Sequence, residues 1–219
     1  MSFNVAIDGP AGAGKSTVAK SVAALKNFIY VDTGAMYRAM ALYFLRQGID
    51  KTDENAINAV LDKVEITIRY ENGAQQVILN GENVSGLIRT EEVGNMASAT
   101  SVYKKVREKL VELQKDLAKK ADVIMDGRDI GTCVLPDADV KVYLTASSAV
   151  RAKRRYHELK EKGTACDLDE IENGHHRTGL PGYASGKLPR LKQADDAVLL
   201  DSSDIDVKRG RGHDHSDDR

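Results

Sequence analysis

The chain has 219 residues, which is enough for one α/β domain with insertions. Its 32 lysines and arginines nearly balance 33 aspartates and glutamates, which argues against a protein that binds nucleic acid or a membrane surface along its whole length. The two cysteines, Cys133 and Cys166, lack the spacing of a metal site or a redox pair, and no apolar run is long enough to cross a bilayer. With no signal-peptide pattern at the N-terminus, we expect a cytoplasmic protein.

A glycine-rich loop lies between the first two predicted elements. Residues 3–8 form an apolar run typical of a buried strand, and residues 16–25 carry apolar side chains at helical spacing. The loop between them fits the pattern G-x-x-x-x-G-K-[ST] of a phosphate-binding P-loop. Its residues are Gly9, Pro10, Ala11, Gly12, Ala13, Gly14, Lys15, Ser16 and Thr17. A glycine-rich turn with a chance lysine is the alternative, but the strand and the helix supply the context that the motif requires.

This loop predicts a site for nucleotide phosphates. Backbone N–H groups of such a loop surround phosphate oxygens, and the N-terminus of the following helix adds its positive dipole end. We expect Lys15 to reach the β- and γ-phosphates and the hydroxyl of Ser16 to hold Mg²⁺.

A second apolar strand over residues 28–32 leads directly into a helix that is predicted to end near residue 47. Open parallel sheets bind ligands at the carboxyl ends of their strands. We therefore expect Thr33, Tyr37 and Arg38 to face the same crevice as the P-loop, where Arg38 could bind an anionic substrate through two hydrogen bonds. A capping threonine and a surface arginine remain the alternative interpretation.

The pattern then changes from helical to strand spacing. A short helix is predicted over residues 55–63, and apolar residues alternate with polar ones from 64 to 70. The dipeptides Asn72-Gly73 and Asn80-Gly81 are strong hairpin signals. Residues 62–90 therefore predict a small antiparallel meander, inserted on the substrate side of the parallel fold without a core of its own.

Residues 91–120 are predicted to form one long helix with an apolar stripe. Its polar residues Ser98 and Arg107 could face the cleft, although a solvated helix face is the better explanation for either one taken alone.

A third buried strand, over residues 123–125, ends in Asp126-Gly127-Arg128-Asp129-Ile130-Gly131-Thr132. We expect Asp126 to support the water shell of Mg²⁺, Arg128 to bind a phosphoryl group and Asp129 to accept hydrogen bonds from a base or a sugar. An ion-paired turn is the alternative for this charged segment.

The remaining elements complete an alternating pattern. Residues 139–145 and 197–201 predict two more strands. Between them, Ser147 is expected to cap a helix that carries Arg151, Lys153, Arg154 and Arg155, which could contact ATP from the lid side or form a solvated basic face. Strands that alternate with helices imply a parallel, doubly wound sheet.

Taken together, these motifs resemble the bacterial cytidylate kinase family, which phosphorylates CMP and dCMP with ATP and Mg²⁺. The resemblance covers about residues 3–170 and 191–206, and it is carried by the P-loop and by residues 32–38, 126–132, 151–155 and 192–197. It implies an α/β fold of the P-loop NTPase type, with a doubly wound, five-stranded parallel sheet, a small antiparallel meander insertion and a mobile lid.

The resemblance also implies roles for individual residues. Lys15, Arg128 and Asp129 are expected to be catalytic, and Arg154 is expected to lie along the adenine of ATP. The residues implied to contact CMP are Thr33, Tyr37, Arg38, Ser98, Arg107, Gly127, Arg128 and Asp129. Ser98 would contact the edge of the cytosine. The three arginines in this group would bind the α-phosphate, and Asp129 would contact the base or the sugar. Transfer would be direct and in line, without a covalent enzyme intermediate.

By the same resemblance, residues 1–219 form a single kinase unit, expected to be a monomer. Its core would comprise about residues 1–35, 91–155 and 191–206. The part that binds the nucleoside monophosphate would span about residues 36–90, the lid about residues 156–190, and a disordered tail residues 207–219.

The lid departs from the family pattern. Where the family has arginines and an aspartate, this sequence has Gly179, Tyr183 and Gly186. Glycines and prolines over residues 173–190 predict an irregular loop instead of a helix. The tail also lacks an expected amphipathic helix. Local shifts of the reading frame would explain both departures, because family-like sequence resumes at Leu191.

Three other functions compete with this interpretation. A kinase for UMP, AMP or shikimate would share the P-loop, but the 126–129 segment and the meander argue against it. A GTPase-like switch is disfavoured because the sequence contains no Asn-Lys-x-Asp motif. The altered lid leaves a nucleotide-binding homologue with weakened catalysis as the third alternative.

Overall fold

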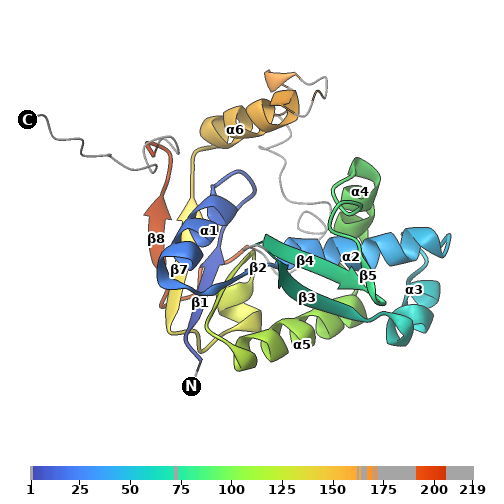
Figure 1. The fold of residues 1–219 in the computed structure, drawn as a ribbon. Coiled ribbons are helices and arrows are strands. Elements are labelled where there is room, and N and C mark those ends of the chain that lie inside the picture. Colours follow the sequence, from blue (N-terminus) through green and yellow to red (C-terminus); the bar gives the residue numbers. More distant parts are fainter. Residues whose placement is uncertain are drawn as a thin grey trace, which may run out of the picture.

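The structure of the chain is a computed structural model that describes residues 2–71, 74–161, 163, 167–169, 171 and 191–205. Its centre is a sheet of five strands in which every pairing is parallel. The strands are β1 (Asn4–Asp8), β2 (Ile29–Asp32), β6 (Val123–Gly127), β7 (Val140–Thr145) and β8 (Val198–Asp201). Their order, β2-β6-β1-β7-β8, places β1 in the middle and confirms the predicted doubly wound sheet (Figure 1).

Helices connect these strands. They are α1 (Lys15–Lys26), α2 (Thr33–Arg46), α3 (Glu54–Val60), α4 (Glu91–Thr100), α5 (Lys104–Lys120) and α6 (Ser148–Glu161). Shorter turns occupy Leu61–Lys63, which is a 3-10 turn, and Ile130–Val134, which has π-helical geometry. In the described residues, no helix has both the length and the apolar character needed to span a membrane.

The strands β1 and β6 at the centre of the sheet are buried on both faces, as in a parallel sheet between helices, whereas the edge strand β8 is exposed. Side chains alternate between the faces of each strand. Val5 and Ile7 of β1 therefore pack with Ile124 of β6 and with Ala19 and Ala23 of α1. On the other face, a larger cluster draws residues from β1, β2, β6, α2, α5 and the inserted meander.

The predicted meander is present beyond β2, at the edge of the sheet opposite β8 (Figure 1). It consists of the antiparallel strands β3 (Ile66–Glu71), β4 (Ala74–Leu79) and β5 (Glu82–Asn83). Asn80 and Gly81 both have positive φ, at 47° and 87°, which confirms the second predicted hairpin turn. The first predicted turn, at residues 72–73, lies outside the described residues.

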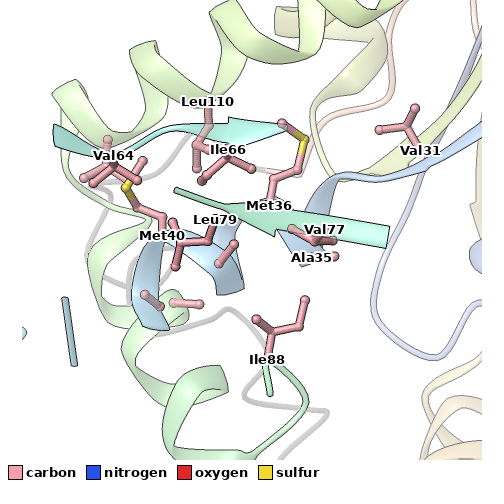
Figure 2. Packing of buried hydrophobic residues seen from close by; sticks show 14 of the residues in the cluster. Val31, Ala35, Met36, Met40, Val64, Ile66, Val77, Leu79, Ile88 and Leu110 are labelled. Carbon is pink, nitrogen blue, oxygen red and sulfur yellow. The ribbon is translucent and has the colours of Figure 1, made fainter. Parts of the chain in front are cut away.

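The meander shares the core of the larger cluster, as expected. Figure 2 shows Met36 and Met40 of α2 beside Ile66 and Leu79 of the meander, with Leu110 of α5 close to them. Each of these five side chains is at most 5% exposed. Because the meander packs into this shared core, its position is tied to α2, which also contributes to the functional cleft.

The prediction of a single helix over residues 91–120 is wrong. The chain breaks between α4 and α5 at residues 101–103. The hydroxyl of Thr100 donates to the carbonyl of Met96, and the hydroxyl of Ser101 donates to that of Ser98. Hydroxyl groups that bond to backbone carbonyls in this way bend and weaken a helix. The break changes the direction of the chain between Ser98 and Arg107.

The predicted lid loop over residues 173–190, with Gly179, Tyr183 and Gly186, lies outside the described residues, as does the tail over residues 207–219.

Candidate nucleotide-binding site

The P-loop connects β1 to α1 and depends on glycine at two positions. Gly9 has a φ of 147°, and a Cβ there would lie 1.9 Å from the carbonyl oxygen of Leu144 on β7. Gly14 is the N-cap of α1 and adopts a left-handed conformation, and no side chain caps this helix. The N–H groups of Thr17 and Val18 donate to the carbonyl oxygen of Gly14, so the N–H groups before them, at the start of α1, are placed to bind phosphate oxygens.

Lys15 bends back over the loop. Its Nζ donates to the carbonyl oxygen of Pro10 at 2.9 Å. Burial lowers the pKa of Lys15 to about 8, and the nearby guanidinium of Arg128 acts in the same direction, against the carboxylate of Asp126. A phosphate group in the loop would supply the negative charge that this buried ammonium needs.

Asp126 ends β6 beside the P-loop and is buried, with 6% of its surface exposed. Ser16 donates to Oδ2 of Asp126 at 2.8 Å, and the hydroxyl of Tyr30 donates to Oδ1 at 3.0 Å. Burial raises the pKa of Asp126, and the neighbouring carboxylate of Asp32 raises it further. A hydroxyl and a carboxylate side by side are the oxygen ligands that Mg²⁺ prefers, so Ser16 and Asp126 fit this ion.

Asp8, the last residue of β1, anchors the segment after β6. Its Oδ1 accepts from the N–H of Ile130 and its Oδ2 from the N–H of Gly131, both at 2.8 Å. Burial raises the pKa of Asp8, although these two hydrogen bonds lower it. This role of Asp8 was not predicted from the sequence. Its position at the end of the first strand, where an acid also ends the second strand, was the available signal.

A cleft of about 290 Å³ opens beside the P-loop. All eight residues expected to contact CMP line it, together with Lys15: Thr33, Tyr37, Arg38, Ser98, Arg107, Gly127, Arg128 and Asp129. Further residues that the sequence analysis did not assign to substrate also line it: Asp32, Gly34, Gly94, Ala97, Ser101 and Asp126. Side chains from α2, α4, α5 and the end of β6 thus converge on one space.

Contacts hold several of these side chains in place. Arg107 and Asp129 form an ion pair, with their side chains 18% and 19% exposed. Arg38 donates from Nη1 to the carbonyl oxygen of Ile88 at 3.2 Å. Thr33 is buried and donates to the backbone carbonyl of Asp126 at 2.8 Å, so its hydroxyl joins α2 to β6.

Arg154 lies on the P-loop and does not line the cleft. Its Nη1 donates to the carbonyl oxygen of Gly12 at 3.2 Å and to Oγ of Ser202 at 3.0 Å. Ser202, buried just after β8, donates in turn to the carbonyl oxygen of Ala13 at 2.8 Å. Ser202 belongs to no motif, so its contact with the P-loop was not predicted from the sequence.

A P-loop that faces a cleft lined by three arginines is the arrangement of a kinase for a small phosphorylated substrate. A sequence model of the cytidylate kinase family matches residues 5–209. The cytidylate kinase of Lactobacillus gasseri is 50% identical over 207 residues, which cover 94% of this chain and 89% of that protein. The cytidylate kinase of Caldicellulosiruptor saccharolyticus is 48% identical over 206 residues, covering 94% and 91%. That of Bacillus pumilus is 46% identical over 211 residues, covering 96% and 93%.

The chain therefore belongs to the cytidylate kinase family, and its reaction is the phosphorylation of a nucleoside monophosphate.

Proposed function

We propose that this chain transfers the γ-phosphoryl group of ATP to CMP and dCMP and requires Mg²⁺. The observation that carries the proposal is the convergence of Thr33, Arg107, Asp129 and the other predicted contacts on the cleft that Lys15 also lines. The similarity to cytidylate kinases over almost the whole chain supports the choice of a cytidine nucleotide.

The P-loop would bind the triphosphate through backbone N–H groups, with Lys15 on the β- and γ-phosphates. Its Nζ would leave the carbonyl of Pro10, to which it now donates at 2.9 Å, for a stronger, charge-assisted partner. Ser16 and Asp126 would hold Mg²⁺, which supplies positive charge to the phosphate oxygens when it is bound.

The cleft would bind the acceptor nucleotide. Arg38, Arg107 and Arg128 offer planar guanidinium groups that match phosphate oxygens, so they would hold the α-phosphate. Asp129 can accept hydrogen bonds from the base or the sugar, while its ion pair with Arg107 fixes its orientation. Ser98 would meet the cytosine edge. Arg154, which lies against the loop carbonyls, would approach the adenine of ATP.

Catalysis would then rest on position and charge. The acceptor oxygen attacks in line, and Lys15 and Arg128 stabilise the charge that spreads over the transferred group. We further infer that the chain acts as a monomeric kinase unit, with residues 36–90 forming the acceptor side and residues 156–190 the lid.

The test is turnover in a coupled assay with ATP and CMP, dCMP, UMP, AMP or shikimate as the acceptor. We expect CMP and dCMP to give the highest kcat/KM and chelation of Mg²⁺ to abolish turnover. A higher kcat/KM with UMP, AMP or shikimate would refute the proposed substrate, and ATP binding without turnover of any acceptor would indicate a non-catalytic homologue.

A further inference from the structure

Asp32, where β2 ends and α2 begins, lies between two cavities. On one side lies the cleft of about 290 Å³, and on the other a second cavity of about 580 Å³. Asp32 lines both, and the second cavity is also bounded by Lys20, Phe28, Tyr70 and Gln75. Asp32 thus borders open space on two sides, so its hydrogen bonds help to hold its position, beside the pairing of β2 with β6.

Gln75, on β4 of the meander, provides two of these hydrogen bonds. The backbone N–H of Asp32 donates to Oε1 of Gln75 at 2.7 Å, and Nε2 of Gln75 donates to the backbone carbonyl of Asp32 at 3.4 Å. The side-chain amide thus takes the place of a neighbouring strand on the open edge of β2.

Two further contacts reach β2, one from Tyr70 at the end of β3 and one from Arg89 after the meander strands. The hydroxyl of Tyr70 donates to the carbonyl oxygen of Tyr30 at 2.6 Å. Arg89 pairs with Oδ2 of Asp32 at 2.9 Å, but the side chain of Arg89 is 62% exposed and its ion pair is screened by solvent. Gln75 is the partner that the backbone of Asp32 has on the open edge of β2, while the other edge pairs with β6 through Asp126.

The position of Asp32 determines where α2 begins. Its Oδ1 accepts from the N–H of Ala35 at 3.0 Å and caps the helix. Gly34 leaves room for this contact, because a Cβ there would lie 3.2 Å from Oδ1. Thr33, Gly34 and Tyr37, which belong to the first turns of this helix, line the cleft.

We propose that Gln75 is a positioning residue for the acceptor nucleotide: it fixes the turn at residues 32–34 and thereby sets the affinity of the cleft for a nucleoside monophosphate. This inference rests on the function proposed above for the same cleft. The meander would then do more than contribute to the core, because the side chain of Gln75 would position residues that line the nucleotide cleft.

The test compares Gln75→Met with Gln76→Met. Methionine keeps the length of glutamine but removes both hydrogen bonds. Gln76 is the adjacent residue on β4, and its Oε1 accepts from Asn83 within the meander, so it serves as a matched control. Amide hydrogen exchange is measured on the ligand-free proteins, and steady-state kinetics are measured with CMP and ATP.

For Gln75→Met we expect the amide of Asp32 to exchange several-fold faster, because it loses its acceptor. The KM for CMP should rise roughly three- to tenfold, which corresponds to one lost hydrogen bond. The KM for ATP and kcat should stay within about twofold of wild type, and Gln76→Met should leave the exchange of Asp32 and all kinetic constants unchanged.

Three results would overturn the inference: unchanged exchange at Asp32, an unchanged KM for CMP despite faster exchange, or equal effects of the two substitutions. A wild-type protein that does not phosphorylate CMP would refute the proposed function instead. The exchange rates of the two variants would then decide on their own whether Gln75 holds the turn.

Discussion

The P-loop and the cleft beside it offer contacts to phosphate groups by different means. The loop is one continuous stretch in which glycines turn backbone N–H groups inward, and Lys15 is the long cationic side chain within it. The cleft is assembled from side chains of α2, α4, α5 and the end of β6. Backbone groups are present whatever the side chains are, whereas the cleft depends on tertiary contacts such as the ion pair of Arg107 with Asp129. Substitutions should therefore affect the two regions in different ways.

The largest expected effect is on the P-loop side. Lys15→Met keeps the length of the side chain but removes its charge from the transferred phosphate, so kcat should fall by about 10³-fold or more. Removing a buried ammonium should leave the thermal stability of the ligand-free protein equal or higher. A kcat close to wild type in the folded variant would contradict the P-loop assignment.

Asp129→Ala should affect the cleft selectively. It leaves Arg107 without its carboxylate partner and removes an acceptor for the base or sugar, which costs roughly 1–3 kcal/mol. Calorimetric titration should show CMP binding weakened about 10- to 100-fold and ATP binding almost unchanged. Asp137→Ala, at an exposed position before β7 that does not line the cleft, is the control. Equal losses for both nucleotides would place Asp129 in the scaffold instead.

Asp8→Asn should lower the free energy of unfolding by about 1–3 kcal/mol, because one of the two N–H donors, from Ile130 or Gly131, loses its acceptor. Urea titration measures this change. Since Asp8 joins the loop side to the cleft side, both nucleotides should also bind less well. A variant with wild-type stability would show that these two hydrogen bonds make no net contribution to the free energy of unfolding.

The smallest expected effect comes from Tyr30→Phe. It removes a hydroxyl that donates to Asp126 but keeps the ring in place, so stability should fall by about 1 kcal/mol. Urea titration of this variant should give a midpoint slightly below wild type. A loss as large as that of Asp8→Asn would mean that the tyrosine supports more of the site than its one hydroxyl contact indicates.

The same contrast explains how much the sequence could predict. The P-loop was predicted because its residues are contiguous and its pattern is specific, and the five strands were predicted because they are short apolar runs. The cleft residues were expected from the ends of strands and from a family resemblance, and the structure brings them together. The roles assigned to individual residues remain predictions.

The missed features depend on contacts between distant residues or on a single rotamer. The break between α4 and α5 comes from hydroxyl groups that turn toward carbonyls, and helical periodicity does not report their rotamers. The hydrogen bonds of Asp8 require β1 to pair with β6 in one register. The contact of Gln75 with Asp32 requires the meander to dock at the sheet edge, which hairpin signals cannot specify.

The carboxylate of Asp8 links the P-loop to the segment that lines the cleft. Asp8 directly precedes Gly9, the first residue of the P-loop, and it also holds the N–H groups that follow Arg128 and Asp129. The donor and the acceptor would thus be aligned by a shared contact in the middle of the sheet. Reactions of this kind lose rate steeply when the reacting atoms are misplaced by about 1 Å. In-line alignment would therefore depend on the centre of the sheet more than on segments at its periphery.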